Sequence, residues 1–318
     1  MMESKNNFIN ETNSVFEQPW WFDTVSKNKW DVLVVTDKDG NIIMRLPYEK
    51  KESFGIKYLG TPTLTQQAGP WINGNKNTKT FNKISNIKKM CDIIIKLFEN
   101  KNIDISFHSS FTYIFPFIWH GYVVEPRLSY VINDLNDLDT VLKNMDNKLR
   151  TKIRKAEKNA DVIYNVPVEK LIILLEKTFE KQNRKIPFEK NLITDIYNNA
   201  LSMNAGICIG AKDKTTGDIL AASFLLYDEN TCYNLLSGKN YDYNKIGIQE
   251  LVLWESIKFA SRHTKKFDFE GSMIPSIESF YRSFGGIPQT YYRIRKGSLI
   301  FNFWQFLKLK IKKIIGFK

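Results

Sequence analysis

The sequence predicts an α/β protein made of two similar units that share a cleft. Its apolar fraction of 43% and aromatic fraction of 14% are sufficient for a large core. Strand-like and helix-like segments alternate along the chain. The order of segments in residues 32–107, a hairpin, a third strand, a helix and a strand, returns in residues 207–269. A pattern that repeats in this way predicts two units of one architecture.

The first half begins with an aromatic-rich lead-in over residues 8–29. A hairpin is expected over residues 31–45, because two aliphatic runs flank the turn sequence DKDGN. The segments expected after it are a strand at 54–59, a turn-rich stretch at 60–71, an amphipathic helix at 84–98 and a strand at 103–107.

The second half carries more helix-period segments. Helices are expected at 135–158, 168–182, 188–203 and 248–263. Strands are expected at 206–212, 219–227 and 231–236, after Lys266, and at 289–295. With a boundary near residues 126–138, the expected domains are 1–130, 131–300 and a basic tail at 301–318.

The segment KFDFEGSMIPSIESFYRSF, residues 266–284, is a candidate wall of a site. In a strand, Asp268 and Glu270 point to one face and the two phenylalanines to the other. A glycine then breaks the strand, and Pro275 suits the first turn of a helix that carries Tyr281 and Arg282. The alternative is that the two acids only pair with nearby lysines.

Charge and composition limit the classes of partner. The net charge of +12 favours an anionic partner such as nucleic acid, a phosphorylated cofactor or an anionic membrane. Three scattered cysteines and three histidines make a zinc site or a disulfide framework improbable, so we expect no metal and a reducing, cytoplasmic location. The polar N-terminus lacks the apolar region of a signal peptide, and no stretch is long enough to span a bilayer.

Two segments supply ten of the twelve net positive charges. Residues 143–158 contain seven basic and two acidic residues, and residues 302–318 contain five lysines and no acid. The first can clamp phosphates or be an ordinary solvated helix face. The second has the composition of a helix lying in the membrane plane, peripheral on an inner membrane face, although a helix docked on the domain is the alternative.

These segments together resemble the GCN5-related N-acetyltransferase (GNAT) superfamily, within it the branch of Fem-type peptidoglycan peptidyltransferases and cellulose-biosynthesis-type acetyltransferases. Four stretches carry the resemblance: KLRTKIRKAEK at 148–158, the helix after Gly247, FDFEG at 267–271 and SFYRSFG at 279–285. The stretch TPTLTQQAGPW at 61–71 also resembles the first unit of bacterial members. The resemblance implies tandem GNAT-like units, each a mixed, mostly antiparallel sheet flanked by helices.

The resemblance also implies site residues. The catalytic residues would be Asp268, Glu270 and Tyr281. The acyl-donor site would include Leu236, Gly238, Lys245, Gly247 and Gln249. The substrate-binding residues would be Lys148, Arg150, Arg154, Gln66, Gln67 and Arg282. A carboxylate would take the proton of the attacking amine, and Tyr281, Tyr241 or Tyr243 would protonate the leaving group.

The donor loop departs from the family pattern. GNAT enzymes hold the donor pyrophosphate on a (Q/R)xxGx(G/A) loop, and the stretch NKIGIQ at 244–249 keeps only Gly247. The implied activity is acyl or aminoacyl transfer from acyl-CoA (acetyl-CoA) or aminoacyl-tRNA to an amine or hydroxyl of a cell-envelope precursor or sugar. The alternative is a non-catalytic module of the same fold that binds RNA or an anionic membrane.

Overall fold

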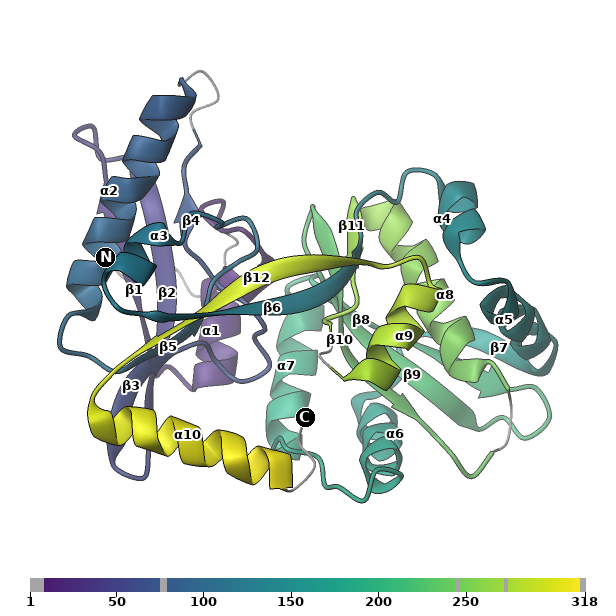
Figure 1. Ribbon diagram of the computed structural model, residues 1–318. Coiled ribbons are helices and arrows are strands. Elements are labelled where there is room, and N and C mark those ends of the chain that lie inside the picture. The colour runs from purple at the N-terminus through teal and green to yellow at the C-terminus, as the bar shows by residue number, and fades with distance from the viewer. Residues whose placement is uncertain (1–8, 75–78, 244–245, 272–273, 315–318) are drawn as a thin grey trace. The chain divides into compact units, whose positions relative to one another are not determined.

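The computed structural model describes residues 9–74, 79–243, 246–271 and 274–314 (Figure 1). The chain divides into two compact units, Met1–Leu128 with Thr290–Lys318, and Ser129–Gln289. Residues 290–300, expected in the second domain, belong to the first unit, because the strand that contains most of them pairs with Ile103–Ser106.

The first unit is a sheet covered by helices. Its strands are β1 (Trp30–Thr36), β2 (Ile42–Ser53), β3 (Ile56–Gly60), β4 (Trp71–Ile72), β5 (Ile103–Ser106), most of β12 (Ile287–Lys296) and the first part of β6 (Val123–Ile132). Its helices are α1 (Pro19–Ser26) after the short 3-10 turn Val15–Glu17, α2 (Thr80–Phe98), α3 (Phe115–Trp119) and α10 (Leu299–Ile314). The strand order is β1-β2-β3-β5-β12-β6, with β4 on β2.

The second unit has the same kind of architecture. Its helices are α4 (Leu138–Asn144), α5 (Asn147–Asn159), α6 (Val168–Glu180), α7 (Lys190–Ser202), α8 (Ile248–His263) and α9 (Pro275–Ser283). Its strands are β7 (Ala160–Tyr164), β8 (Gly206–Asp213), β9 (Ile219–Tyr227), β10 (Thr231–Lys239) and β11 (Lys266–Asp268), in the order β11-β10-β9-β8-β7 after the end of β6.

The internal repeat is confirmed. In the first unit the hairpin β1–β2 leads to β3, α2 and β5, and β3 and β5 pair in parallel. In the second the hairpin β8–β9 leads to β10, α8 and β11, and β10 and β11 pair in parallel. Every other pairing with a described register is antiparallel, so each unit is the mixed, mostly antiparallel α/β sheet that was expected.

Hydrophobic periodicity explains the main helices. In α2, Cys91, Ile94 and Phe98 are buried as expected, whereas Ile84 at the far end of the predicted face is exposed. In α8 most residues from Ile248 to Ala260 are buried, since this helix packs on several strands of the second sheet and on α5.

The middle of the chain holds one strand that was not predicted and one helix that was predicted wrongly. The division between the two units, after Leu128, falls within the expected boundary at residues 126–138. These residues contain the second half of β6, which was not predicted because Pro126 lies inside the strand and strand interiors usually exclude proline. The helix expected at 135–158 is two helices, α4 and α5. The chain is extended at Met145, and the Asp146 carboxylate then caps α5 by accepting from the backbone N–H groups of Lys148 at 2.7 Å and Leu149 at 3.2 Å.

Candidate active site

The candidate site begins where the short strand β11 ends. Residues Thr231–Tyr233 of β10 pair with Lys266–Asp268 of β11, and Phe267 and Asp268 pair with β6 on the other side. The chain leaves the sheet after Asp268. Two buried strands therefore flank the last residue of β11, and its carboxylate lies in the interior of the unit.

Asp268 is a buried acid held by two hydrogen bonds. Its side chain is 2% exposed, and its Oδ1 accepts from the hydroxyl of Ser129 on β6 and from the backbone N–H of Glu270 at 2.8 Å. Burial raises the pKa of Asp268 to about 6, although both hydrogen bonds act in the opposite direction. This carboxyl group therefore titrates close to neutral pH.

Glu270 is the most unusual residue of the site. Its backbone has φ +55°, a left-handed conformation that is uncommon for a non-glycine residue. Its Oε1 is buried and accepts no hydrogen bond within the described structure. Burial, with the negative charge of Asp268 as a second cause, holds the pKa of Glu270 well above its usual value. A strained acid with a buried oxygen that lacks a hydrogen-bond partner among the described residues is characteristic of a functional site.

Tyr281 completes this group. It lies on α9, and its ring stacks on Phe269 with the centroids 4.9 Å apart and the planes at 28°. Burial raises the pKa of Tyr281, and the charges of Glu270 and Asp268 raise it further. The phenol is therefore protonated near neutral pH. The structure thus brings together all three side chains that were expected to be catalytic.

Arg282, expected to bind substrate, forms an ion pair on its own helix. It is exposed, and its Nε donates to Oε1 of Glu278 at 2.9 Å. The same carboxylate oxygen accepts from the hydroxyl of Tyr130 at 2.9 Å. These contacts fix the outer side of α9.

The expected donor site includes a strand edge that β11 leaves uncovered. Strand β10 pairs with β9 from Cys232 to Lys239, but with β11 only as far as Tyr233. Leu236 follows an irregularity in the β9 pairing and is nearly buried. Gly238 lies against α6, where a Cβ atom would come within 2.6 Å of the Leu174 carbonyl carbon. Close helix packing therefore accounts for this glycine.

The start of α8 fits a donor pyrophosphate only in part. Gly247 caps the helix with φ +84°, and a Cβ there would lie 2.2 Å from the Lys152 carbonyl oxygen of α5. The first turn carries Glu250, whose carboxylate is 3.2 Å from the Lys152 ammonium group. Gln249 has a buried Oε1 that accepts no hydrogen bond within the described residues, whereas Lys245 lies outside them. An acid in the first turn competes with a bound phosphate for the helix dipole.

The basic helix α5 has the expected apolar face, with Leu149, Ile153 and Ala156 buried. Lys148 and Arg154 are exposed on its other side. Arg150 is partly exposed and donates to the Asn147 side chain one turn earlier. Two of the three cations expected to bind phosphate thus face solvent.

Gln66 and Gln67 belong to the first unit and are described there alone. Gln67 is buried, and its Oε1 accepts from the backbone N–H of Ser109 at 2.6 Å. Its Nε2 donates to Oε1 of Gln66 at 3.4 Å. The pair is therefore held within its own unit, and its expected contact with substrate stays a prediction.

Sequence reasoning missed Ser129, whose hydroxyl donates to Asp268 and accepts from the backbone N–H of Gly271 at 3.1 Å. It lies more than a hundred residues before the acids, in a strand that was not predicted, so no local pattern indicated it. Among the described residues, no group of three His, Cys, Asp or Glu side chains is placed to hold a metal ion. Over the same residues, no helix is both long and apolar enough to cross a bilayer.

Comparisons with known proteins support the predicted fold. Residues 143–273 match the sequence model of the acetyltransferase (GNAT) domain. The match with the crystal structure of FemX covers 92% of this chain and 96% of the FemX chain, with 12% identity and a TM-score of 0.69. The structure of L-PGS from Bacillus licheniformis covers 85% and 86%, with 13% identity and a TM-score of 0.50.

A third similar fold is the C-terminal domain of a putative lysylphosphatidylglycerol synthetase from Agrobacterium fabrum, with 11% identity, a TM-score of 0.51 and 87% of each chain covered. No curated protein sequence matches this chain significantly. Residues 143–273 therefore contain the predicted GNAT-type acetyltransferase domain, and the whole chain has a fold like that of FemX.

Proposed function

We propose that this protein moves an acyl or aminoacyl group onto an amine of a cell-envelope precursor or sugar, with Glu270 as the general base. The single observation that carries the proposal is the Glu270 carboxylate. Its buried Oε1 accepts no hydrogen bond from the described residues, its pKa is raised, and its backbone is left-handed. It follows the end of a strand in the GNAT domain. A base needs an elevated pKa if it is to take a proton near neutral pH.

The chemical steps assign one role to each of the three side chains. An ammonium acceptor loses a proton to Glu270, and the free amine attacks the donor carbonyl. A C–N bond forms, the donor's C–S or C–O bond breaks, and the leaving sulfur or oxygen takes the Tyr281 phenolic proton. The attacking nitrogen loses its second proton to the Tyr281 phenolate, which restores the phenol. Asp268 fixes the backbone of Glu270 and raises its pKa. Tyr243 is a poorer proton donor, since its hydroxyl already donates to Asp218 at 2.5 Å.

The α8 terminus favours aminoacyl-tRNA over acyl-CoA as the donor. The family's pyrophosphate loop is reduced to Gly247, and the Glu250–Lys152 pair lies beside the helix N-terminus. The exposed Lys148 and Arg154 give α5 a basic surface that suits a polynucleotide backbone. On this proposal Arg282 contributes to acceptor binding, and acyl-CoA is the competing donor.

The test compares two donors under identical conditions. Purified protein is mixed with radiolabelled acetyl-CoA or with tRNA charged with radiolabelled amino acids, each with glucosamine or a lysine-containing muropeptide as acceptor. The proposal expects acceptor-dependent loss of label from the charged tRNA, and a fall of about 10² or more in rate for Glu270→Gln. Turnover of acetyl-CoA alone would reverse the donor assignment.

Thermal shift with uncharged tRNA, CoA and acetyl-CoA at two salt concentrations separates failure of chemistry from failure of binding, because a ligand that binds only the native state raises its stability. No transfer and no shift with any of these compounds would overturn the proposal and favour a non-catalytic module that binds another RNA or a membrane.

A further inference from the structure

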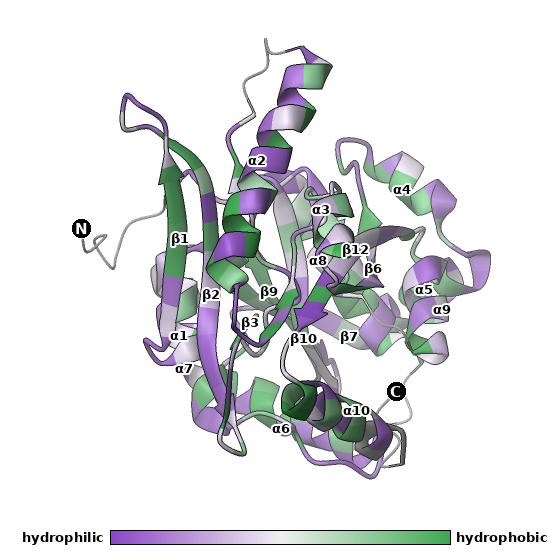
Figure 2. Cartoon of the chain, turned by 60° about the vertical axis from the view of Figure 1, so that its left-hand side comes forward, coloured by the Kyte–Doolittle hydropathy of each residue, from purple (hydrophilic) through white to green (hydrophobic). Residues whose placement is uncertain are grey.

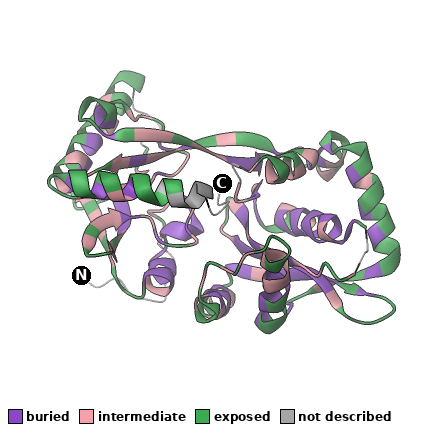
Figure 3. Cartoon of the chain, turned by 60° about the horizontal axis from the view of Figure 1, so that its bottom comes forward, coloured by how far each residue is buried: buried purple, intermediate pink, exposed green. Residues whose placement is uncertain are grey.

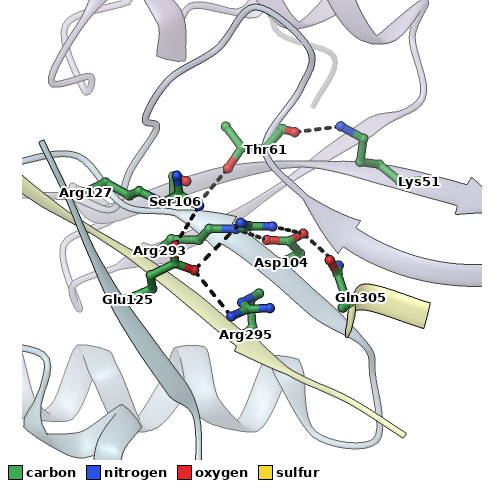
Figure 4. Close-up of polar contacts among 9 residues, drawn as sticks. All are labelled: Lys51, Thr61, Asp104, Ser106, Glu125, Arg127, Arg293, Arg295 and Gln305. Atoms are coloured by element: carbon green, nitrogen blue, oxygen red, sulfur yellow. Dashed lines mark hydrogen bonds and ion pairs between the residues drawn. The ribbon is translucent and has the colours of Figure 1, made fainter. Parts of the chain in front are cut away.

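The C-terminal helix α10 presents two opposite apolar faces, and only one is covered. The covered face is built from residues three and four apart. Phe301 is fully buried, and the Trp304 ring packs on Tyr58 with the centroids 5.6 Å apart. Gln305 is 3% exposed, and its Nε2 donates to Oδ2 of Asp104 at 2.8 Å (Figure 4).

The docking of α10 belongs to a polar network inside the first unit. Asp104 also accepts two hydrogen bonds from Arg293 on β12, at 2.6 and 2.7 Å. Glu125 of β6 pairs with Arg295 at 3.3 Å (Figure 4). Because Gln305 ends this chain of contacts in a nearly buried position, the rotation of α10 about its own axis is fixed. The residues on its other side are therefore held outward.

The outward side of α10 is apolar. Phe303, Phe306 and Leu307 are 61%, 51% and 40% exposed, and Leu299 and Ile300 extend the same side toward the start of the helix. Figure 3 shows the exposed residues along this helix, and Figure 2 shows hydrophobic residues along the same helix. A contiguous apolar surface of this kind marks an interaction site.

The charges that follow identify the partner. Residues 299–318 contain five lysines and no acid, and all five come after Leu307. The Lys310 ammonium nitrogen lies over the Phe306 ring, 4.7 Å from its centroid, so a positive charge stands directly beside the apolar side. Exposed aromatic residues followed by lysines, in a segment that contains no acidic residue, match a surface with an apolar interior and an anionic boundary.

We propose that the outward face of α10 docks the protein on an anionic phospholipid membrane, with Phe303, Phe306 and Leu307 inserted among the acyl chains and the lysines on the headgroups. This docking does not depend on the proposed acyl transfer. Membrane binding leaves the packing of the opposite face intact, because Phe301 and Gln305 hold the helix on its unit while the outer side binds lipid.

Sedimentation with vesicles tests the proposal on the full-length protein. Binding is expected to vesicles of phosphatidylcholine mixed with phosphatidylglycerol, to weaken in high salt, and to be much weaker with phosphatidylcholine alone. Phe303→Ser and Leu307→Ser should each weaken binding about tenfold. Lys310→Gln should weaken it about fivefold on the anionic vesicles only.

The matched control is Phe81→Ser, which removes a 79% exposed phenylalanine from helix α2. It should leave vesicle binding unchanged, and circular dichroism should show every variant folded. Equal binding by wild type and Phe303→Ser would overturn the proposal. A wild-type protein that binds neither kind of vesicle would also overturn it, whether the protein is a monomer or self-associates. Self-association through this face would be shown by a wild-type oligomer and a monomeric Phe303→Ser variant.

Discussion

The backbone N–H of Glu270 donates a 2.8 Å hydrogen bond to Oδ1 of Asp268, two residues earlier. This contact ties the left-handed backbone of Glu270, at φ +55°, to a carboxylate that is itself buried. Glu270 therefore lies outside strand β11, which ends at Asp268, and its pKa is raised beside Asp268. The local geometry holds two acids close together, and neither forms an ion pair with a cation among the described residues.

Replacing Glu270 with glutamine should lower kcat about 10²- to 10⁴-fold and change KM little, because the amide keeps the shape but accepts no proton. The assay is label transfer from the better donor to the amine acceptor. Glu229→Gln, an exposed acid in the turn before β10, is the matched control and should retain full activity.

The two acids should make stability fall as pH rises. The pKa of Asp268 is raised from 3.8 to about 6, so between these values the native state holds a proton that the unfolded chain has lost. The free energy of unfolding contributed by this group is complete below about pH 4 and is lost as pH passes about 6. The pKa of Glu270 is also raised, so Glu270 adds a loss of the same sign.

Urea unfolding over a pH series measures this effect as the difference between wild type and Asp268→Asn. The variant should gain stability relative to wild type as pH increases, since asparagine does not ionise. A difference that does not vary with pH would show that Asp268 titrates normally.

Ser129→Ala should shift the pH–rate profile to higher pH. The Ser129 hydroxyl donates to Asp268 and lowers the pKa of that carboxyl group, so its loss raises the pKa further and changes the coupled titration of the pair. Ser129→Thr keeps a hydroxyl and should restore the wild-type profile. An unshifted profile in the alanine variant, with lower stability alone, would reduce Ser129 to a structural role.

Gly247→Ala should destabilise the protein by more than about 3 kcal/mol. Alanine there must adopt φ +84°, and its Cβ would lie 2.2 Å from the Lys152 carbonyl oxygen. Gly217→Ala is the matched control, because Gly217 has φ +77° with no atom within 4 Å of its would-be Cβ. Chemical unfolding should show a loss of only about 1 kcal/mol for the control. Equal losses would mean that α5 does not pack closely on α8.

Asp104→Ala should destabilise the first unit by about 3 kcal/mol, because it leaves Arg293 and Gln305 without their acceptor in a largely buried position. Asp92→Ala breaks an exposed Lys88–Asp92 pair and should change stability by less than about 1 kcal/mol. Chemical unfolding compares the two. If the loss is the same for both, the polar network shown in Figure 4 contributes no more than a surface ion pair.

Local sequence patterns predicted the residues of the candidate site better than they predicted the pairing of distant strands. Asp268, Glu270 and Tyr281 lie within fourteen residues, so their strand, turn and helix could be predicted from alternation, glycine and proline. Ser129 could not, because the pairing of β6 with β11 is a long-range contact between a proline-containing strand and a three-residue one. The break at Asp146 did carry a signal, since aspartate is a favoured N-cap.

The tail shows what periodicity leaves undecided. Its helical pattern indicated one apolar stripe and two alternatives, membrane or domain. The described part of α10 has two stripes, and Phe301 and Gln305 dock one of them on the first unit. Which stripe packs depends on Tyr58 and Asp104, more than a hundred residues away, so only the tertiary structure reveals the second face.

The most direct test of Glu270 as the general base is the pH dependence of acyl transfer by wild type and Glu270→Gln. Charged tRNA is the donor and the lysine-containing muropeptide is the acceptor. The wild-type rate should rise with pH through the raised pKa of the acid pair, and the variant should be slower by about 10² or more and lack this rise. A variant with the wild-type rate and pH profile would contradict the assignment of Glu270 as the base.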